Sequence, residues 1–396
     1  MADAPASPAS DIDLYADDVL ADPFPAYREL RDAGSAVWLR ETGACFLGRY
    51  ADVRSALSDW ETYSSADGIG LNAIINHAWD EALICQDPPV HTERRKLMNE
   101  ALGPRSIKPV EDTIRARADI LAQHLAARGA FDGVADFAHD LPINVVMDLI
   151  GWPEDVRPEL LKIADGSWNA AGPEGARMRE GLVQLERLLA LITAIHDEKR
   201  VQPGSFAAQL VDASEQGIIT RETSIGMLMG YVVAAFETTI SAMASGLWLF
   251  ARNPDEWAKL RSKPELAIRA ANEIVRMESP LQNFSRKATR DVTFEDGSTI
   301  PAGARVIVSY ASANRDERQF DQPDRFIIDR SERQTLAFGH GPHGCAGQGL
   351  ARMELTAVFE ALAARIERLE LAGEPTRTLN NVSRAFASLP IRAIAV

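Results

Sequence analysis

The sequence of 396 residues predicts a mostly helical domain with small β-sheets at one side, which is an α+β architecture. Three observations support this class. Long segments repeat apolar residues at helical spacing, short strand-like segments gather in a few clusters, and no repeat or low-complexity linker divides the chain. We therefore expect a disordered tail over residues 1–12, where small residues prevail, and a single domain over residues 13–396.

The predicted helices are segments in which apolar residues recur three and four positions apart. These segments cover residues 24–34, 51–60, 111–129, 175–200, 255–277 and 349–371. The predicted strands are shorter. They comprise a hairpin within residues 36–50, alternating strands within residues 287–314 with a turn at Asp296-Gly297, and a last strand within residues 380–396.

The most apolar segment, residues 224–250, is long enough to span a membrane and carries one charged residue, Glu237. No second segment of this kind occurs in the sequence, and no basic flank marks a cytoplasmic side. A helix that is apolar on all faces equally suits the centre of a large protein. We therefore expect a buried helix that Thr220 caps and Asn253-Pro254 ends, and no membrane association.

Glu237 and Thr238 lie in the middle of this apolar helix. They must find partners there, because an unsatisfied buried polar group costs roughly 1–3 kcal/mol. The partners could be structural, with Thr238 bonded to the preceding turn and Glu237 paired with an arginine. Alternatively, the two side chains could deliver protons to a ligand in a cavity. The sequence alone leaves both interpretations open.

Composition argues against several functions. The net charge of −15 argues against a nucleic-acid partner, because binding to phosphates needs a basic face. The three cysteines, Cys45, Cys85 and Cys345, are far apart and form no C-x-x-C pair, which argues against a disulfide framework and a zinc site. The first residues lack the features of an export or organelle signal, so we expect a cytoplasmic protein.

The stretch LAFGHGPHGCAGQGLARMEL, residues 336–355, has two interpretations. Residues 339–344 spell G-x-G-x-x-G, which is typical of an NAD-dependent oxidoreductase. Pro342 weakens this interpretation, since proline has no backbone N–H to offer a pyrophosphate. The chain also ends too soon after Glu374 for the remaining βα units. The dinucleotide site stays as the alternative.

The other interpretation centres on Cys345. A cysteine at the start of a helix has several free backbone N–H groups around it, and their field stabilises a thiolate that can ligate a metal. The preceding glycines let the loop pass close beneath a flat ring, and His343 with a nearby arginine could reach a cofactor carboxylate.

The loop resembles the haem-binding loop of the cytochromes P-450 in the spacing of Phe338, Gly339, Gly341, His343, Cys345 and Gly347. Other motifs resemble the same family and occur in its order: DPPVHTERR at 87–95, AAFETT at 234–239, E-x-x-R at 273–276, NFSRKATR at 283–290 and QPDRF at 322–326. The resemblance covers nearly the whole chain.

This resemblance implies the cytochrome P-450 fold, with haem b between the long central helix and the helix after the cysteine loop. Cys345 would be the axial ligand of the haem iron. The other implied cofactor contacts are His91, Arg95, Arg286 and His343 for the propionates, and Phe338, Ala235 and Gly347. Glu273, Arg276 and Arg325 would form a buried ion network that serves folding and not chemistry.

The resemblance also implies a monooxygenase that uses dioxygen and electrons from NAD(P)H. An axial thiolate pushes electron density onto the iron and favours cleavage of the O–O bond. Glu237 would be the acid and Thr238 the alcohol of catalysis, although many members have aspartate at the first position and glycine where this chain has Ala235. No flavin-binding extension and no membrane anchor are visible, so we expect electrons to arrive through a separate iron–sulfur ferredoxin and its reductase. We also expect a monomer. A haem-binding protein without turnover is the non-enzymatic alternative.

Within the family, the chain resembles soluble bacterial members that oxidise small para-substituted aromatic acids. Those relatives hold a carboxylate with an arginine and polar residues, whereas the corresponding positions here are Ala66-Asp67, Met229-Gly230 and Val233. An acidic Asp67 would repel a carboxylate unless its loop turns outward. We therefore expect a neutral aromatic substrate, such as a methoxyphenol, or another small apolar ring. The expected pocket residues are Ile69, Leu71, Ile74, Trp168, Val232, Val233, Phe236, Leu281, Phe284 and Phe386.

Overall fold

The structure, a computed structural model, describes residues 7–164, 166–331 and 334–396. Helices form most of it. The helices of eight or more residues are α2 (Phe24–Ala33), α3 (Tyr50–Ser58), α5 (Val90–Leu102), α7 (Glu111–Arg128), α8 (Asp140–Ile150), α9 (Arg157–Ala164), α10 (Ala176–Asp197), α11 (Phe206–Glu215), α12 (Arg221–Arg252), α13 (Pro254–Ser262), α14 (Ala267–Glu278) and α16 (Gln348–Arg365). The shorter α-helices are α1 (Asp17–Ala21), α4 (Ala73–Ala78), α6 (Pro104–Ile107) and α15 (Tyr310–Ala313).

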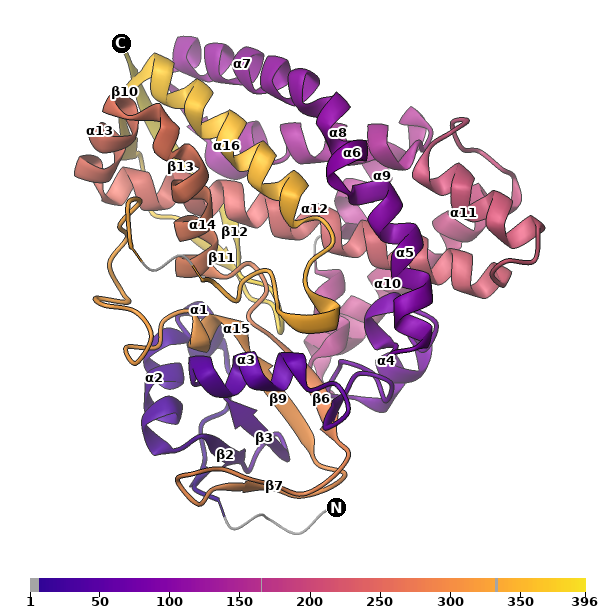
Figure 1. The fold of residues 1–396 in the computed structure, drawn as a ribbon. Coiled ribbons are helices and arrows are strands. Elements are labelled where there is room, and N and C mark those ends of the chain that lie inside the picture. Colours follow the sequence, from indigo (N-terminus) through magenta and orange to yellow (C-terminus); the bar gives the residue numbers. More distant parts are fainter. Residues whose placement is uncertain (1–6, 165, 332–333) are drawn as a thin grey trace.

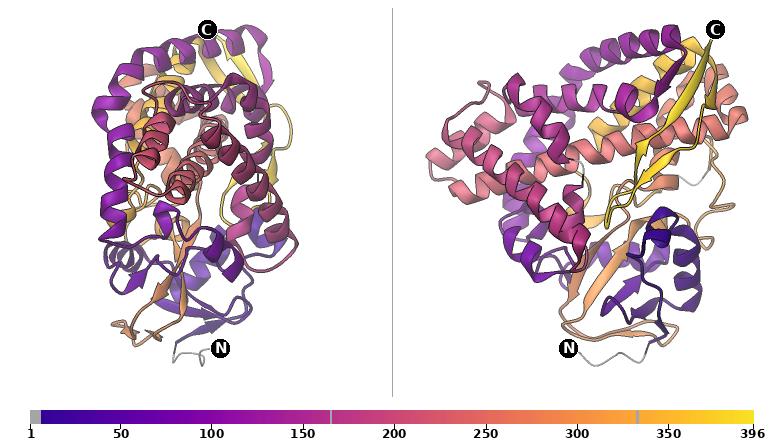
Figure 2. Two further views of the ribbon diagram at one scale, coloured as in Figure 1. Left: turned by 90° about the vertical axis from the view of Figure 1, so that its right-hand side faces the viewer. Right: turned by 180° about the vertical axis from the view of Figure 1, so that it is seen from behind.

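The strands of the described residues form small sheets, as the sequence predicts. The largest has the order β1 (Ala9–Ser10), β2 (Ala36–Leu39), β3 (Ala44–Leu47), β9 (Arg305–Ser309), β6 (Asn283–Ala288) and β4 (Tyr63–Ser64). The others are β10 (Ile366–Leu371) with β13 (Pro390–Ala395) and β5 (Ala130–Asp132), β11 (Thr376–Thr378) with β12 (Ala385–Ser388), and β7 (Val292–Thr293) with β8 (Thr299–Ile300). Figure 1 shows the largest sheet in the lower part of the molecule and the helices α7, α12 and α16 in the upper part. The views in Figure 2 show the same division from the side and from behind.

The predicted hairpins are confirmed by strand register. Ala36 pairs with Leu47 across the antiparallel strands β2 and β3. Between β7 and β8, Gly297 adopts a φ of +82°, a backbone conformation that glycine reaches without strain. The predicted C-terminal strand is also present, as β12 and β13.

Two predicted helices end earlier than the sequence pattern indicates. The segment 255–277 is divided into α13 and α14, because Pro264 has no N–H to continue the hydrogen-bond ladder and instead begins a single 3₁₀ turn. In the segment 349–371, the helix α16 ends at Arg365, and the remaining residues form strand β10 beside β13. Residues 366–371 therefore form a strand although their apolar residues have helical spacing, because β13 offers hydrogen-bond partners to their backbone.

The predicted tail over residues 1–12 needs a correction. Residues 1–6 lie outside the described residues. Ala9 and Ser10 form the short strand β1, which pairs in parallel with Trp38 and Leu39 of β2. The ordered chain therefore starts before residue 13.

The central helix α12 is capped as predicted, since the Thr220 hydroxyl accepts a hydrogen bond from the backbone N–H of Thr223. It is the one described helix long and apolar enough to cross a membrane, and 67% of its most apolar window is buried inside the protein. Its first half packs into one hydrophobic cluster with Phe206 and Phe284, and its second half into another with α14 and α16. The helix α12 therefore contacts both hydrophobic clusters of the core.

Candidate active site

The loop before α16 is shaped by glycines at positions that other residues would strain. Gly339 and Gly341 both have a φ of +67°. A Cβ added to Gly341 would lie 2.2 Å from the carbonyl oxygen of Leu57, so the loop also passes too close to α3 for any side chain there. The backbone N–H of Cys345 donates to the carbonyl of Phe338 over 2.7 Å and closes the loop. The sequence therefore folds locally so that Cys345 stands just before the first turn of α16.

Opposing effects act on the pKa of the Cys345 thiol. Burial raises the pKa of its thiol, while the backbone N–H groups of Gly347 and Gln348 and the guanidinium groups of Arg95 and Arg352 oppose that rise. The net direction is upward, so the free thiol stays protonated at neutral pH. A bound metal cation reverses this, because coordination removes the thiol proton.

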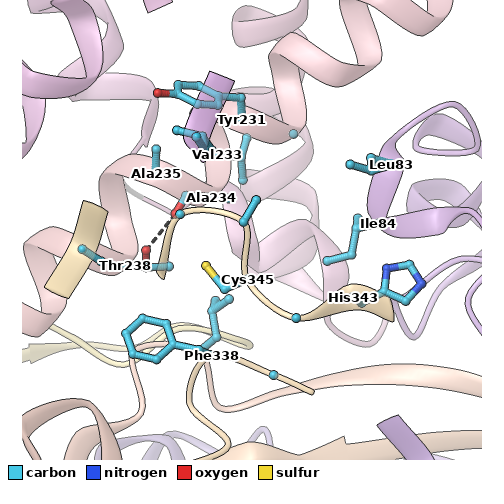
Figure 3. Close-up of a pocket in the computed structure, with 18 of the residues that line it drawn as sticks. Leu83, Ile84, Tyr231, Val233, Ala234, Ala235, Thr238, Phe338, His343 and Cys345 are labelled. Atoms are coloured by element: carbon cyan, nitrogen blue, oxygen red, sulfur yellow. Dashed lines mark hydrogen bonds between the residues drawn. The ribbon is translucent and has the colours of Figure 1, made fainter. Parts of the chain in front are cut away.

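A cavity of about 260 Å³ separates this loop from α12. Figure 3 shows Cys345 on the loop and Ala234, Ala235 and Thr238 on α12 at facing sides of the same space. Many of the predicted site residues line this cavity, namely Cys345, His343, Phe338, Gly347, His91, Arg95, Arg286, Ala235, Thr238, Trp168, Val233, Leu281 and Phe284.

Two arginines and two histidines interact within this cavity wall. The rings of His91 and His343 lie 4.3 Å apart between centroids. Burial and then the neighbouring arginines lower the pKa of His91 to about 4 and, with a contribution from His91, that of His343 to about 2. Both rings are therefore neutral at pH 7. The Nε2 atom of each is buried without a hydrogen-bond partner among the described residues.

The two arginines also lack a counter-charge. Arg95 donates to the carbonyl of Gly344 over 2.5 Å and Arg286 to that of Ser285 over 2.8 Å, and no ion pair of either occurs in the described part of the chain. Arg286 is only 3% exposed. Because buried cations need anionic partners, this end of the cavity is suited to carboxylates of a ligand.

These observations together test whether haem fits. Its propionates match the unpaired arginines and the free imidazole nitrogens, and its iron matches a lone cysteine opposite an apolar helix. A Cβ added to Gly347 would meet no atom within 4 Å, so this part of the loop leaves room for a flat ring. The residues present fit a haem.

On α12, Glu237 and Thr238 point in different directions. Thr238 lines the cavity and its hydroxyl donates to the carbonyl of Ala234 over 2.7 Å. The Glu237 side chain is 7% exposed and accepts from the Ser383 hydroxyl and, over 3.4 Å, from the Asn380 amide. It lines a second cavity of about 130 Å³. The predicted acid and alcohol are therefore adjacent in sequence but separated by the helix backbone.

Several predicted pocket residues do not line the first cavity, and these assignments are corrected. Phe236 and Phe386 line the second cavity, because Phe236 lies on the Glu237 side of α12. Ile74 is 52% exposed. The others are packed elsewhere: Ile69 and Val232 are buried in the core, and Leu71 packs against the cluster near the N-terminus.

The predicted ion network is present with one changed member. Arg276 donates to both carboxylate oxygens of Glu273, over 2.7 and 2.8 Å. The third member is Arg330, whose Nε lies 3.1 Å from Glu273 Oε1. The side chain of Arg325 bonds Gln322 at the surface, and only its backbone carbonyl joins the network.

Sequence reasoning missed other lining residues, including Trp79, Leu83, Ile84, Tyr231 and Glu354. The first three lie in short segments without periodicity. Glu354 is 1% exposed, and burial raises its pKa to about 8. Its signal was visible, because a carboxylate four residues after Leu350 stands in the apolar stripe of a helix.

The dinucleotide alternative is contradicted by the backbone. Residues 334–338 form no strand, and β10 after α16 pairs antiparallel with β13. A dinucleotide fingerprint requires a strand on each side of the helix in a parallel sheet. The glycines of residues 339–344 therefore serve the cysteine loop.

Comparison with known proteins decides the family. The family model described as Cytochrome P450 matches residues 185–384. The chain belongs to the cytochrome P450 family. Cytochrome p450 CYP199A2 of Rhodopseudomonas palustris is 37% identical over 385 residues, which are 96% of this chain and 93% of that protein. The linalool 8-monooxygenase of Pseudomonas putida is 31% identical and covers 96% of this chain, with 97% of its own length aligned.

Solved structures agree with this assignment. The cytochrome P450 CYP268A2 of Mycobacterium marinum in complex with pseudoionone has a TM-score of 0.88 at 27% identity, with 98% of this chain and 100% of that chain covered. CYP109E1 from Bacillus megaterium in complex with testosterone has a TM-score of 0.86 at 26% identity, with 96% and 100% covered. The present P450 is accordingly an oxygen-incorporating oxidoreductase with the cytochrome P450 fold, in a family whose members use haem and dioxygen.

Proposed function

We propose that this P450 inserts one oxygen atom from dioxygen into a small, neutral, aromatic substrate, by hydroxylation or oxidative O-demethylation. The observation that carries the proposal is the cavity itself. Cys345 and Thr238 face the same space from opposite sides, and the aromatic side chains of Trp168 and Phe284 form part of its wall. Aromatic walls suit a flat ligand.

In this proposal the Cys345 sulfur would hold the iron of haem b, and its thiolate would favour O–O cleavage of dioxygen when haem is bound. Arg95, Arg286, His91 and His343 hold the propionates. This role is supported by the missing counter-charges and the unpartnered imidazole nitrogens. The remaining predicted contacts, Phe338, Ala235 and Gly347, line the same cavity.

Oxygen insertion needs protons as well as electrons, because one oxygen atom leaves as water and consumes two protons per product. Thr238 is the only one of the two predicted proton-handling residues that lines the Cys345 cavity in the described part of the chain. We assign to its hydroxyl the positioning of water or dioxygen beside the haem. Glu237 is the acid that supplies protons to this hydroxyl from the other side of α12.

The neutral character of the substrate follows from the cavity wall. The positions that bind a carboxylate in relatives that oxidise aromatic acids are here occupied by Met229, Gly230 and Val233, which carry no charge. Asp67 is 54% exposed, lies 3.2 Å from the ammonium group of Lys287 and does not line the cavity, so its charge does not bear on the substrate. The loop thus turns the Asp67 carboxylate outward. Apolar contacts with Val233 and Leu281 remain to hold the ring.

We further propose that electrons come from NAD(P)H through an iron–sulfur ferredoxin and its reductase. Arg105 and Lys108 are exposed near the start of α7 and could meet an acidic partner. The neighbouring Arg94 and Lys96 are paired within the chain, with Glu81 over 2.6 Å and with Glu93 over 2.8 Å. The protein is expected to work as a cytoplasmic monomer, which size-exclusion chromatography tests.

The proposal is tested by titrating the purified holoprotein with neutral phenols and with benzoates of the same size. Displacement of water from the iron by a fitting ligand shifts the spin state and the visible spectrum. We expect a shift with 4-methoxyphenol and a weaker one with 4-methoxybenzoate. Product formation is then measured with a surrogate ferredoxin and reductase. A stronger response to the benzoate would overturn the neutral substrate, and electron transfer without product from a broad panel would favour a non-catalytic haem protein.

A further inference from the structure

The helix α12 separates two cavities that differ in chemistry. The first contains Cys345 and Thr238. The second lies on the other face of α12 and is lined by Glu237, His139, Ile143, Leu160, Ala385 and Phe386, among others. Its volume of about 130 Å³ is room for about four water molecules at roughly 30 Å³ each. Because it contains a buried carboxylate, water is the expected content.

The Glu237 carboxylate is held in this second cavity by a prepared pair of donors. The Ser383 hydroxyl and the Asn380 amide donate to the same oxygen, Oε1. Both donor side chains are almost completely buried, with 4% and 3% exposure. Asn380 is itself fixed, since its carbonyl oxygen accepts from the backbone N–H groups of Val382 and Ser383 over 3.0 Å each. Its amide nitrogen must therefore face Glu237.

The segment that carries this pair is anchored to the substrate side of the core. The backbone N–H of Gln282 donates to the carbonyl of Val382 over 2.8 Å, and that of Arg384 donates to the carbonyl of Pro280 over 2.9 Å. The donors therefore keep their place when Glu237 moves. His139, which precedes α8, also lines this cavity and is partly exposed, so the lining of the cavity reaches the protein surface.

We propose that Ser383 and Asn380 are positioning residues that hold Glu237 on the proton-loading side of α12, where water in the second cavity recharges it. When Glu237 leaves this pair, its carboxyl group carries one proton around the helix to the Thr238 side and returns ionised. This inference rests on the proposed function, because it takes Glu237 as the acid. The proton comes from solvent and ends in the water that oxygen insertion releases.

The first test is structural and independent of turnover. Crystal structures of the holoprotein, Ser383→Ala and Ser388→Ala are compared. Ser388 on strand β12 is the matched control, because its hydroxyl also donates to a carboxylate, that of the partly buried Asp132, over 2.5 Å to Oδ2. We expect ordered water against Glu237 in wild type and in Ser388→Ala, and a displaced Glu237 carboxylate in Ser383→Ala. A dry cavity, or an unmoved carboxylate in Ser383→Ala, overturns the inference.

The second test measures proton delivery. The solvent isotope effect on NADH oxidation and the ratio of peroxide to product are measured with 4-methoxyphenol for wild type, Ser383→Ala, Ser383→Thr, Ser388→Ala and Glu237→Gln. We expect Ser383→Ala to raise the solvent isotope effect and the ratio of peroxide to product by about threefold each. This effect is small beside the 10²–10⁴-fold contribution of general acid–base catalysis, because Glu237 itself is still present. Ser383→Thr should restore the wild-type values, and Ser388→Ala should leave them unchanged. If Glu237→Gln alters proton delivery but Ser383→Ala behaves like Ser388→Ala, the positioning role is wrong. If Glu237→Gln itself has no effect, the acid assignment under the proposed function fails first, and with it this inference.

Discussion

The guanidinium of Arg330 lies 3.1 Å from the Glu273 carboxylate, and both side chains are almost completely buried. The same carboxylate accepts two bonds from Arg276. Removing Arg330 leaves the Glu273–Arg276 pair in place, but the Glu273 carboxylate and the backbone carbonyls of Gln322 and Arg325 lose a charged donor, and such a loss costs about 1.5–3 kcal/mol. We therefore expect Arg330→Gln to lower the free energy of unfolding by this amount and to reduce the yield of folded holoprotein, as measured by urea denaturation and haem content.

Arg325→Gln is the matched control for that change. Its side chain bonds Gln322 at the surface, so its loss should change stability by less than about 0.5 kcal/mol. Equal destabilisation by Arg325→Gln and Arg330→Gln would show that the side chain of Arg325 belongs to the network.

Cys345→Ser should abolish the thiolate spectrum of the reduced, carbon monoxide-treated protein, because a hydroxyl does not replace a thiolate on iron. Cys85→Ala is the control. Cys85 is buried in the hydrophobic core and does not line the Cys345 cavity, so it is no ligand there. A thiolate spectrum that survives in Cys345→Ser would refute the ligand assignment.

Gly230 is a glycine in the interior of α12 that lines the first cavity, and a Cβ added there would meet no atom within 4 Å. Since glycine costs a helix about 1 kcal/mol relative to alanine, Gly230→Ala should stabilise the protein by up to about 1 kcal/mol. Gly230→Leu should weaken binding of a two-ring ligand such as 4-phenoxyphenol more than that of 4-methoxyphenol. Thermal unfolding and spin-state titrations measure the two effects.

Gly246→Ala, on the same helix, provides the contrast, because its Cβ would lie 2.2 Å from the Phe359 ring and should destabilise the protein. If Gly230→Leu leaves both ligands unaffected, the space beside Gly230 is not part of the substrate pocket.

Glu354 makes stability depend on pH. Its folded pKa, raised by burial to about 8, exceeds the unfolded value near 4.5. Between these values the folded state keeps the proton and the unfolded state releases it, so stability falls as pH rises, by up to about 1.4 kcal/mol per pH unit. Above pH 8 the contribution is constant. Glu354→Gln should remove this slope in urea denaturation between pH 5 and 8.

Glu360→Gln, also on α16, is the control, since Glu360 pairs with Arg115 at 2.6 Å and is partly exposed. It should retain the wild-type slope. A slope that persists unchanged in Glu354→Gln would mean that Glu354 is ionised in the folded protein.

The sequence predicted best what local chemistry controls. The cap at Thr220, the turn at Gly297 and the loop before Cys345 depend on the residue types within a few positions, and the structure has them as expected. The prediction missed the helices α5, α8 and α11, although α8 and α11 are as amphipathic as the predicted helix α3. Packing against α12 and its neighbours stabilises them.

Side-chain direction accounts for the remaining errors. On α12 the cavity face runs through Gly230, Ala234 and Thr238, so Val232 and Phe236 point away by the helical period of 3.6 residues. That signal was available in the sequence. The choice between Arg325 and Arg330 was not, because it depends on a turn in which Gln322 has a φ of +46°.

The partition that α12 forms also bears on how such an enzyme changes over time. Substitutions at Gly230 or Val233 reshape the substrate side, whereas Glu237, Ser383 and Asn380 stand behind the helix and do not line that cavity. Selection for a new substrate can therefore act on one face of a single helix while the proton supply on the other face is inherited intact.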